Sequence, residues 1–293
     1  MNSFIAVHPA VLAFYFISVL AVTMFSANPI LLLCAFLGSI LFLIKVQRQT
    51  FSFKSFNSFL ILFLLISFTN PLFSHNGVTV LFFLNQNPVT LEAFFYGVNT
   101  AVMLIAVLLW FKVFNLTLND DKLLFLLAKL SPKISLLVSS ALRFLPLFKR
   151  QAEKLSATQK AMGLFAENTW TDKLRSAMRV YSALITWALE NAIDTGSSMK
   201  ARGYGLKGRS NFSNFTFRAS DAVLTAVISA ADAIIIAVMA VGELSFTFYP
   251  EISAKDISVY GILAIIAFFA LSLLPFIIEV KGDFSWKYYR SKI

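Results

Sequence analysis

Residues 28–45 read NPILLLCAFLGSILFLIK, an apolar run that carries no charge before its final lysine. A helix that crosses a membrane needs roughly 20 mostly apolar residues, because the hydrocarbon core is about 30 Å thick. Comparable apolar stretches occupy residues 9–26, 57–74, 93–114, 220–242 and 257–280. The short link Ser26-Ala27-Asn28-Pro29 joins the first two as a helical hairpin, with Pro29 suited to a helix start. The sequence therefore predicts an all-α integral membrane protein with about six transmembrane helices.

The overall composition points to the same class of protein. Of the 293 residues, 58% are apolar and only 14% are charged, which excludes a disordered chain and argues against a soluble domain. The single cysteine, Cys34, rules out an intrachain disulfide and a cysteine-rich metal site, and the two histidines lie far apart in sequence. We see no catalytic Ser/His/Asp set, and we expect no resident metal and no cofactor in this chain.

The positive charge is concentrated in one segment. The chain carries +10 overall, and residues 116–218 hold 16 of its 25 Lys and Arg and 7 of its 15 Asp and Glu, which is +9 of that total. The region 70–92 holds no Lys or Arg, and 243–256 holds only Lys255. Because basic loops stay on the cytoplasmic side of a membrane, this alternation predicts a cytoplasmic 116–218 and cytoplasmic N- and C-termini. We expect a membrane region with four spans at 1–115, and one with two spans and a short tail at 219–293.

Long amphipathic helices are predicted within the basic segment. Between residues 173 and 202, apolar residues recur every three or four positions from Leu174 to Ile193, and Gly203 offers a helix end. A second helix is predicted at 133–162, ending at Gly163, and a shorter one at 120–130. Such helices could lie on the membrane surface, pack together as a small bundle, or present an apolar face to one partner and a basic end to another.

The stretch Ala201-Arg202-Gly203 admits two interpretations. A cation in the last turn followed by glycine is typical of a helix C-terminus, where it satisfies the helix dipole and the terminal carbonyls. The guanidinium of Arg202 is also a good fork for a partner's carboxylate. The glycine-rich run 203–208 formally matches GxGxxG, but a long helix precedes it where a phosphate-binding loop needs a strand. We therefore expect no phosphate binding there.

Asp232 stands near the middle of the fifth predicted span. Charge at that depth is costly and often functional, which leaves open a standalone membrane carrier or enzyme that uses this carboxyl group. The alternative is a structural aspartate, protonated or hydrogen-bonded beside Ser229 and Thr225 on the same side of the helix.

Several segments together resemble a known family. They are Asn70-Pro71-Leu72-Phe73-Ser74-His75-Asn76-Gly77, Thr90-Leu91-Glu92-Ala93 with Tyr96-Gly97, Ser140-Ala141-Leu142-Arg143-Phe144-Leu145-Pro146, and Met199 through Gly205. In this order they resemble the transmembrane T component of energy-coupling factor (ECF) transporters, the family that includes the CbiQ-type cobalt permease. The resemblance is strongest over about 70–210.

This resemblance implies a non-catalytic scaffold in a bacterial cell membrane. Its partners would be two cytoplasmic ABC-type ATPases, which bind ATP and Mg²⁺, and a small membrane subunit (the S subunit) that binds a vitamin or metal ion. The long cytoplasmic helices would be coupling helices that transmit ATP-driven motion to the S subunit. Besides the lipid bilayer no further partner is implied, and no nucleic acid is expected.

The family's coupling helices end in two Ala-Arg-Gly motifs whose arginines sit in grooves of the two ATPases. The second motif is intact here as Ala201-Arg202-Gly203. The first aligns with Ala161-Met162-Gly163, so its arginine is missing, and either Lys160 or Lys154 substitutes as a point charge or one ATPase contact is mainly apolar. Arg143 and Pro146, from a further matching segment, are candidate supporting residues.

Overall fold

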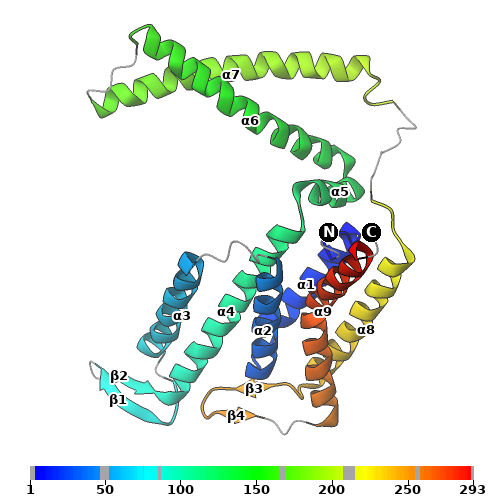
Figure 1. Ribbon diagram of the computed structural model, residues 1–293. Helices are drawn as coiled ribbons and strands as arrows, with labels where there is room; N and C mark the ends of the chain where they lie inside the picture. Colours follow the sequence, from blue (N-terminus) through cyan, green and yellow to red (C-terminus); the bar gives the residue numbers. More distant parts are fainter. Residues whose placement is uncertain are drawn as a thin grey trace. The chain divides into compact units, whose positions relative to one another are not determined.

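The computed structural model describes residues 4–46, 53–74, 76–84, 87–164, 169–206, 215–254 and 258–291 (Figure 1). Within these ranges the helices are α1 (Pro9–Phe25), α2 (Pro29–Val46), α3 (Phe53–Phe73), α4 (Leu91–Thr117), α5 (Asp120–Leu130), α6 (Pro132–Ala161), α7 (Trp170–Ala201), α8 (Ala219–Val241) and α9 (Val259–Arg290). The chain divides into two compact units, one made of Met1–Leu123 with Phe215–Ile293, and the other of Leu124–Asn214. We call them the membrane unit and, after the coupling helices that the family resemblance implies for it, the coupling unit.

The prediction of an all-α membrane protein is confirmed. Helices α2, α4, α8 and α9 are each long and apolar enough to cross a membrane, while α1 and the Asn57–Phe73 part of α3 are shorter apolar helices. All six coincide with the predicted stretches to within a few residues, except that α9 continues past residue 280 to Arg290. At 1.5 Å per residue α9 is about 48 Å long, so its charged last turns extend beyond the hydrocarbon core.

Aromatic side chains fill the centre of the membrane unit. Edge-to-face ring contacts connect Phe4, Tyr15, Phe16, Phe42 and Trp110. The Tyr15 hydroxyl donates to the Leu271 carbonyl on α9 at 3.1 Å, and the Trp110 indole N–H donates to the Ala35 carbonyl on α2, also at 3.1 Å. Because a bilayer offers no water to these polar groups, the two hydrogen bonds fix how α1, α4, α2 and α9 meet.

Small residues allow the helices of this unit to approach closely. A Cβ added at Gly38 on α2 would lie 2.7 Å from the Cβ of Ser272 on α9, and one added at Gly97 on α4 would lie 2.7 Å from the Ser67 carbonyl oxygen on α3. Van der Waals packing at such small residues is a main source of helix association in lipid, where the hydrophobic effect supplies little.

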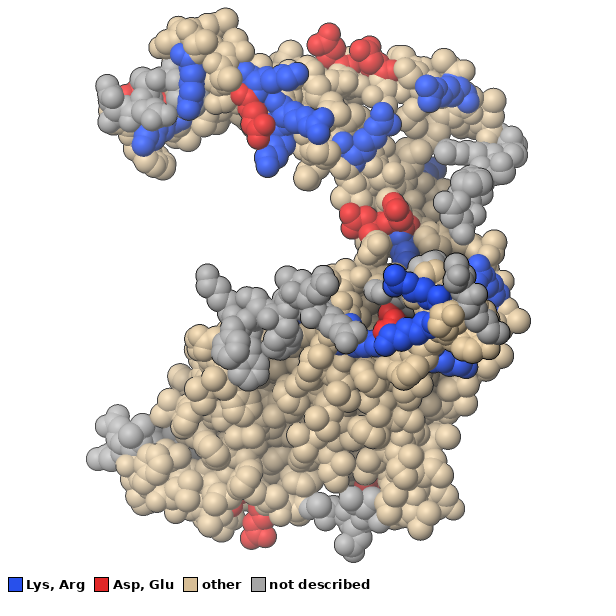
Figure 2. Space-filling view, in the orientation of Figure 1, with Lys and Arg blue, Asp and Glu red and all other residues tan. Residues whose placement is uncertain are grey.

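One end of the membrane unit carries its polar connections. The Glu279 carboxylate accepts from the Phe4 N–H at 3.1 Å, and Lys45 pairs with Asp283 at 2.6 Å, so α9 is tied there to both the N-terminal segment and α2. Lys122 donates to the carbonyls of Ile5 and Thr117, and burial lowers the pKa of its ammonium group. Figure 2 shows Lys and Arg side chains gathered toward one end of the membrane unit. The Lys and Arg whose side chains are described in this unit are Lys45, Lys112, Lys122, Arg218, Lys281, Lys287 and Arg290.

The opposite end carries two short antiparallel hairpins that the sequence did not predict. Strands β1 (Val80–Leu84) and β2 (Asn87–Thr90) precede α4, while β3 (Phe246–Thr247) and β4 (Ser253–Ala254) lie between α8 and α9. The first hairpin is fastened to α4 because the buried Glu92 carboxylate accepts from the Thr79 N–H at 3.1 Å. The described residues 76–84, 87–90 and 242–254 contain no Lys or Arg, so basic charge separates strongly between the two ends.

Candidate functional site

Helices α6 and α7 form the body of the coupling unit and cross each other (Figure 1). The Phe148 ring of α6 meets the Trp187 ring of α7 edge to face at 5.8 Å, near the middle of both helices, and Phe144 stacks on Phe148. The predicted helices 133–162 and 173–202 are therefore present, beginning at Pro132 and Trp170. At its start, α6 is joined to α5 by a hydrogen bond from Ser135 to the Leu124 carbonyl.

The end of α6 is a Schellman motif. Gly163 has φ +71°, its N–H donates to the Lys160 carbonyl at 3.0 Å, and the Leu164 N–H donates to the Gln159 carbonyl at 3.0 Å. These two bonds satisfy carbonyls that the helix end would otherwise leave open. The Leu164 carbonyl in turn accepts from Arg179 and Ser176 of α7, which fastens this tip to the early turns of the next helix.

The end of α7 has the same backbone geometry. Gly203 has φ +81°, its N–H donates to the Lys200 carbonyl at 3.0 Å, and the Tyr204 N–H donates to the Met199 carbonyl at 3.0 Å. The helix C-terminal interpretation of Arg202-Gly203 therefore describes the backbone correctly. Lys207 and Gly208, which complete the glycine-rich run 203–208, lie outside the described residues.

The two tips differ mainly in one exposed side chain. Lys160-Ala161-Met162-Gly163 and Lys200-Ala201-Arg202-Gly203 match position by position, with Met162 and Arg202 both at the position where the helix ends. Both side chains are exposed, Met162 to 67%. One backbone shape thus presents a flexible apolar side chain at α6 and a planar cation at α7.

The structure places the other predicted site residues at varying distances from these tips. Lys160 is in the last turn of α6, and Lys154 is two turns earlier, both exposed. Pro146 lies about 24 Å along the helix axis from Met162, at 1.5 Å per residue, and Arg143 is farther still. Arg143 and Pro146 are therefore not part of either tip, and both side chains are exposed on α6.

The apolar face of α7 is only partly used within the coupling unit. Leu184 and Trp187 are half-buried, whereas a stripe of large apolar side chains on the same helix is 41–70% exposed. This stripe consists of Leu174, Met178, Tyr181, Ile185, Leu189 and Ile193. A continuous exposed apolar surface of this kind marks an interaction site more often than ordinary protein surface. Sequence periodicity predicted the apolar face but could not show which part of it stays uncovered.

Asp232 is hydrogen-bonded to a neighbouring helix. Its carboxylate accepts a hydrogen bond of 2.5 Å from Ser18, which lies on α1. Thr225 and Ser229 donate instead to the carbonyls of Asp221 and Ala226 on their own helix. Ser229 and Thr225, which stand on the same side of α8, therefore do not hold Asp232, because hydroxyl groups on a helix readily bond to carbonyls of the preceding turn.

Sequence comparisons show which known proteins the chain is similar to. A family model described as "Cobalt transport protein" (CbiQ) matches residues 5–213, which is more than two thirds of the chain. A Listeria innocua protein named energy-coupling factor transporter transmembrane protein EcfT is 34% identical over 94 residues, 31% of this chain and 36% of its own length. A Bacillus selenitireducens protein of the same name is 29% identical over 97 residues, 32% of this chain and 36% of its own length. The aligned part thus spans about a third of these curated relatives.

Replacing Gly203 by alanine is expected to loosen the α7 tip. A residue with a Cβ pays about 1–2 kcal/mol in the left-handed conformation, and this Cβ would also lie 3.1 Å from Leu206 Cδ1. Hydrogen exchange of the last-turn amides of α7 should become about 5- to 30-fold faster, the factor that 1–2 kcal/mol produces. Gly196→Ala is the matched control, because no atom lies within 4 Å of its Cβ and alanine favours a helix. Unchanged exchange in Gly203→Ala would contradict the assigned geometry.

Proposed function

The chain belongs to the CbiQ family of cobalt transport proteins, and we propose that it is the transmembrane T component of an energy-coupling factor importer. In this role it catalyses no reaction. It joins two cytoplasmic ABC-type ATPases, which bind ATP and Mg²⁺, to a small membrane S subunit that binds a vitamin or metal ion. The names of its relatives support this proposal, and the observation that carries it is the pair of tips with one backbone geometry at the ends of α6 and α7.

Two equivalent tips suit a pair of ATPases. The family resemblance implies one groove on each ATPase, so a scaffold that moves with both needs two projections with a similar backbone. Rigid helices ended by Schellman motifs supply such projections, because every carbonyl that these bonds satisfy keeps the last turn ordered. The segment that holds the tips carries +9 of the net charge of +10, and this favours contact with acidic protein surfaces.

Arg202 gives the α7 tip a specific chemistry. A guanidinium carries five N–H donors in a fixed plane and binds carboxylates through two parallel hydrogen bonds. Its exposed position at the end of α7 allows it to enter a partner's groove, and the helix C-terminus behind it favours positive charge. In the proposal Arg202, flanked by Ala201 and Gly203, docks on a carboxylate of one ATPase.

Met162 gives the α6 tip a different contact. Methionine is flexible and polarisable and fills irregular apolar pockets well. The neighbouring Leu164 is also exposed, so this tip presents two apolar side chains, with Lys160 two residues before Met162 as a point charge. We therefore assign a mainly apolar contact to Ala161-Met162-Gly163 on the second ATPase, and the two tips would select different partner surfaces.

The exposed apolar stripe of α7 is the proposed docking surface for the S subunit. Fully burying a side chain of this kind contributes about 1.5–3 kcal/mol, so even partial coverage of its six members supports a stable contact. The stripe and Arg202 lie on one rigid helix. ATP-driven movement of an ATPase that holds Arg202 would thereby displace the surface on which the S subunit rests.

The distribution of charge supports an orientation in the cell membrane. Lys and Arg gather at the end of the membrane unit that holds the chain's described termini, and the positive-inside rule assigns such an end to the cytoplasm. Both termini and residues 116–218 would then be cytoplasmic. The rival proposal of a carrier built on Asp232 receives less support, because Ser18 from α1 already gives that carboxyl group a structural partner.

The charge reversal Arg202→Glu tests the ATPase contact. Losing one partner of a buried, hydrogen-bonded charge pair costs about 2–5 kcal/mol, so ATPase association should weaken by about 30-fold or more while membrane insertion is unchanged. Co-purified ATPase and ATP-driven uptake in proteoliposomes are the measurements. Lys149→Glu is the control, since it makes the same change of charge at an exposed site of α6 away from both tips. Undiminished binding and uptake with Arg202→Glu would sink this assignment.

Ile185→Glu and Leu189→Glu test the S-subunit contact. A carboxylate in a buried apolar interface loses hydration without a partner, so each variant should release the S subunit and leave the ATPases bound. Thr186→Glu places the same charge on the same turn outside the stripe and should keep the S subunit. Subunit composition after purification is the readout, and retention of the S subunit in both stripe variants would refute the docking surface.

A further inference from the structure

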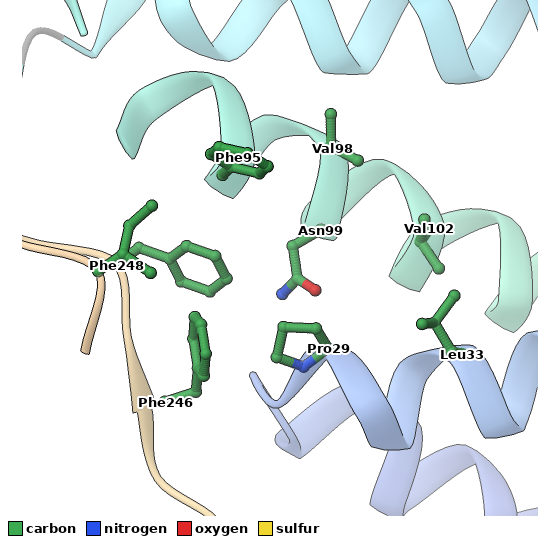
Figure 3. A pocket seen from close by; sticks show the side chains of 9 residues that line it. Pro29, Leu33, Phe95, Val98, Asn99, Val102, Phe246 and Phe248 are labelled. Carbon is green, nitrogen blue, oxygen red and sulfur yellow. The ribbon is translucent and has the colours of Figure 1, made fainter. Parts of the chain in front are cut away.

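A groove of about 350 Å³ lies in the membrane unit between the first turns of α2 and α4 (Figure 3). Phe95, Val98, Asn99 and Val102 line it from α4, at the spacing of one helix face. From Phe95 to Val102 this face covers about two turns of α4, or roughly 10 Å. Pro29 and Leu33 of α2 form the opposite wall. The groove therefore runs along the axes of two membrane-spanning helices, inward from the end that lacks basic residues.

The third wall comes from the connection between α8 and α9. Phe246, Phe248 and Ile252, in and beside the β3–β4 hairpin, complete the lining, and Figure 3 shows both phenylalanine rings facing the α2–α4 space. The Phe246 and Phe248 rings also contact each other at 4.7 Å, and Phe248 meets Tyr96 of α4 at 5.4 Å. These contacts fix the wall in place, so the groove is preformed in the absence of a ligand.

The lining selects a hydrocarbon ligand. Asn99 is the one polar side chain among the nine residues that line the groove, and its amide N–H donates to the Ala27 carbonyl at 3.0 Å. That hydrogen bond fastens α4 to the connection between α1 and α2. None of the nine lining residues carries a charge. A polar or ionic ligand would lose its hydration here without compensation, whereas a hydrocarbon chain would lose none.

The groove opens onto the lipid-facing surface of the spans. Leu33 and Phe95, which stand on its rim, are 51% and 49% exposed, and they continue the exposed apolar faces of α2 and α4. Both helices are candidate membrane spans, so the molecules that surround this opening in a bilayer are lipids. We propose that the groove binds one acyl chain of a phospholipid from the leaflet opposite the basic end of the membrane unit. The bound acyl chain supplies the van der Waals contacts that an empty groove would lack.

Photo-crosslinking in lipid nanodiscs tests this site. The full chain is incorporated with phosphatidylglycerol that carries a diazirine near the end of one acyl chain, and adducts are mapped by peptide mass spectrometry. Adducts should concentrate on peptides that contain residues 95–102 and 246–252. Val98→Trp and Val102→Trp fill the groove and should lower these adducts about tenfold, which corresponds to 1.4 kcal/mol. Leu104→Trp is the matched control, because Leu104 is exposed on α4 and does not line the groove.

Three results would overturn the proposal. The first is adducts spread evenly over the exposed faces of α2 and α4. Lipid at the groove would then be no different from the lipid that surrounds the rest of the protein. The second is an unchanged groove signal in Val98→Trp and Val102→Trp, or an equal loss in Leu104→Trp. The third is a crosslink from the groove to a neighbouring protein subunit in native membranes in place of lipid. If a tryptophan variant is not monodisperse, the adduct map of the unmodified chain decides between the first result and the proposal.

Discussion

A bilayer offers no hydrogen-bond partner to backbone N–H and C=O groups, so the apolar stretches of this chain can cross it only as helices. The same constraint governs the side chains. Tyr15 and Trp110 reach carbonyls of neighbouring helices, and Asp232 is held by Ser18. At its two ends, where the membrane unit meets water, the chain carries other kinds of structure. The described residues of the two hairpins at one end include no Lys or Arg, while the Lys45–Asp283 ion pair and other basic side chains lie at the other end.

The coupling unit differs from the membrane unit because α7 keeps a stripe of large apolar side chains exposed. Two long helices cannot cover each other fully when they cross, so the stripe on α7 stays available. Backbone chemistry then ends both helices in the same way, and a single side chain, Met162 or Arg202, distinguishes the tips. If the two tips bind two different partners, such a difference in one side chain is enough for each tip to select its own partner, and the backbone need not change.

Local patterns in the sequence predicted most of the helices, and long-range contacts explain the rest. Hydropathy and periodicity placed α1 and α6 to within one residue at each end, because span length and amphipathicity are properties of neighbouring residues. The β1–β2 hairpin was missed because Val80-Leu81-Phe82-Phe83-Leu84 is uniformly apolar and shows no strand alternation. The partner of Asp232 and the groove beside Asn99 depend on segments far apart in sequence. The missing first arginine and the glycine at each helix end were visible in the sequence, whereas the hydrogen bonds that give both tips the same geometry were not.

The subunit composition of the complex in its own membrane tests the central claim most directly. The chain, tagged at one end, is purified in mild detergent from membranes that contain its natural partners, and the intact complex is weighed by native mass spectrometry. The account predicts two ABC-type ATPase subunits and one small membrane subunit for each copy of this chain. A chain that transports a solute when reconstituted alone, or that purifies without ATPases under conditions in which it is folded, would contradict the account.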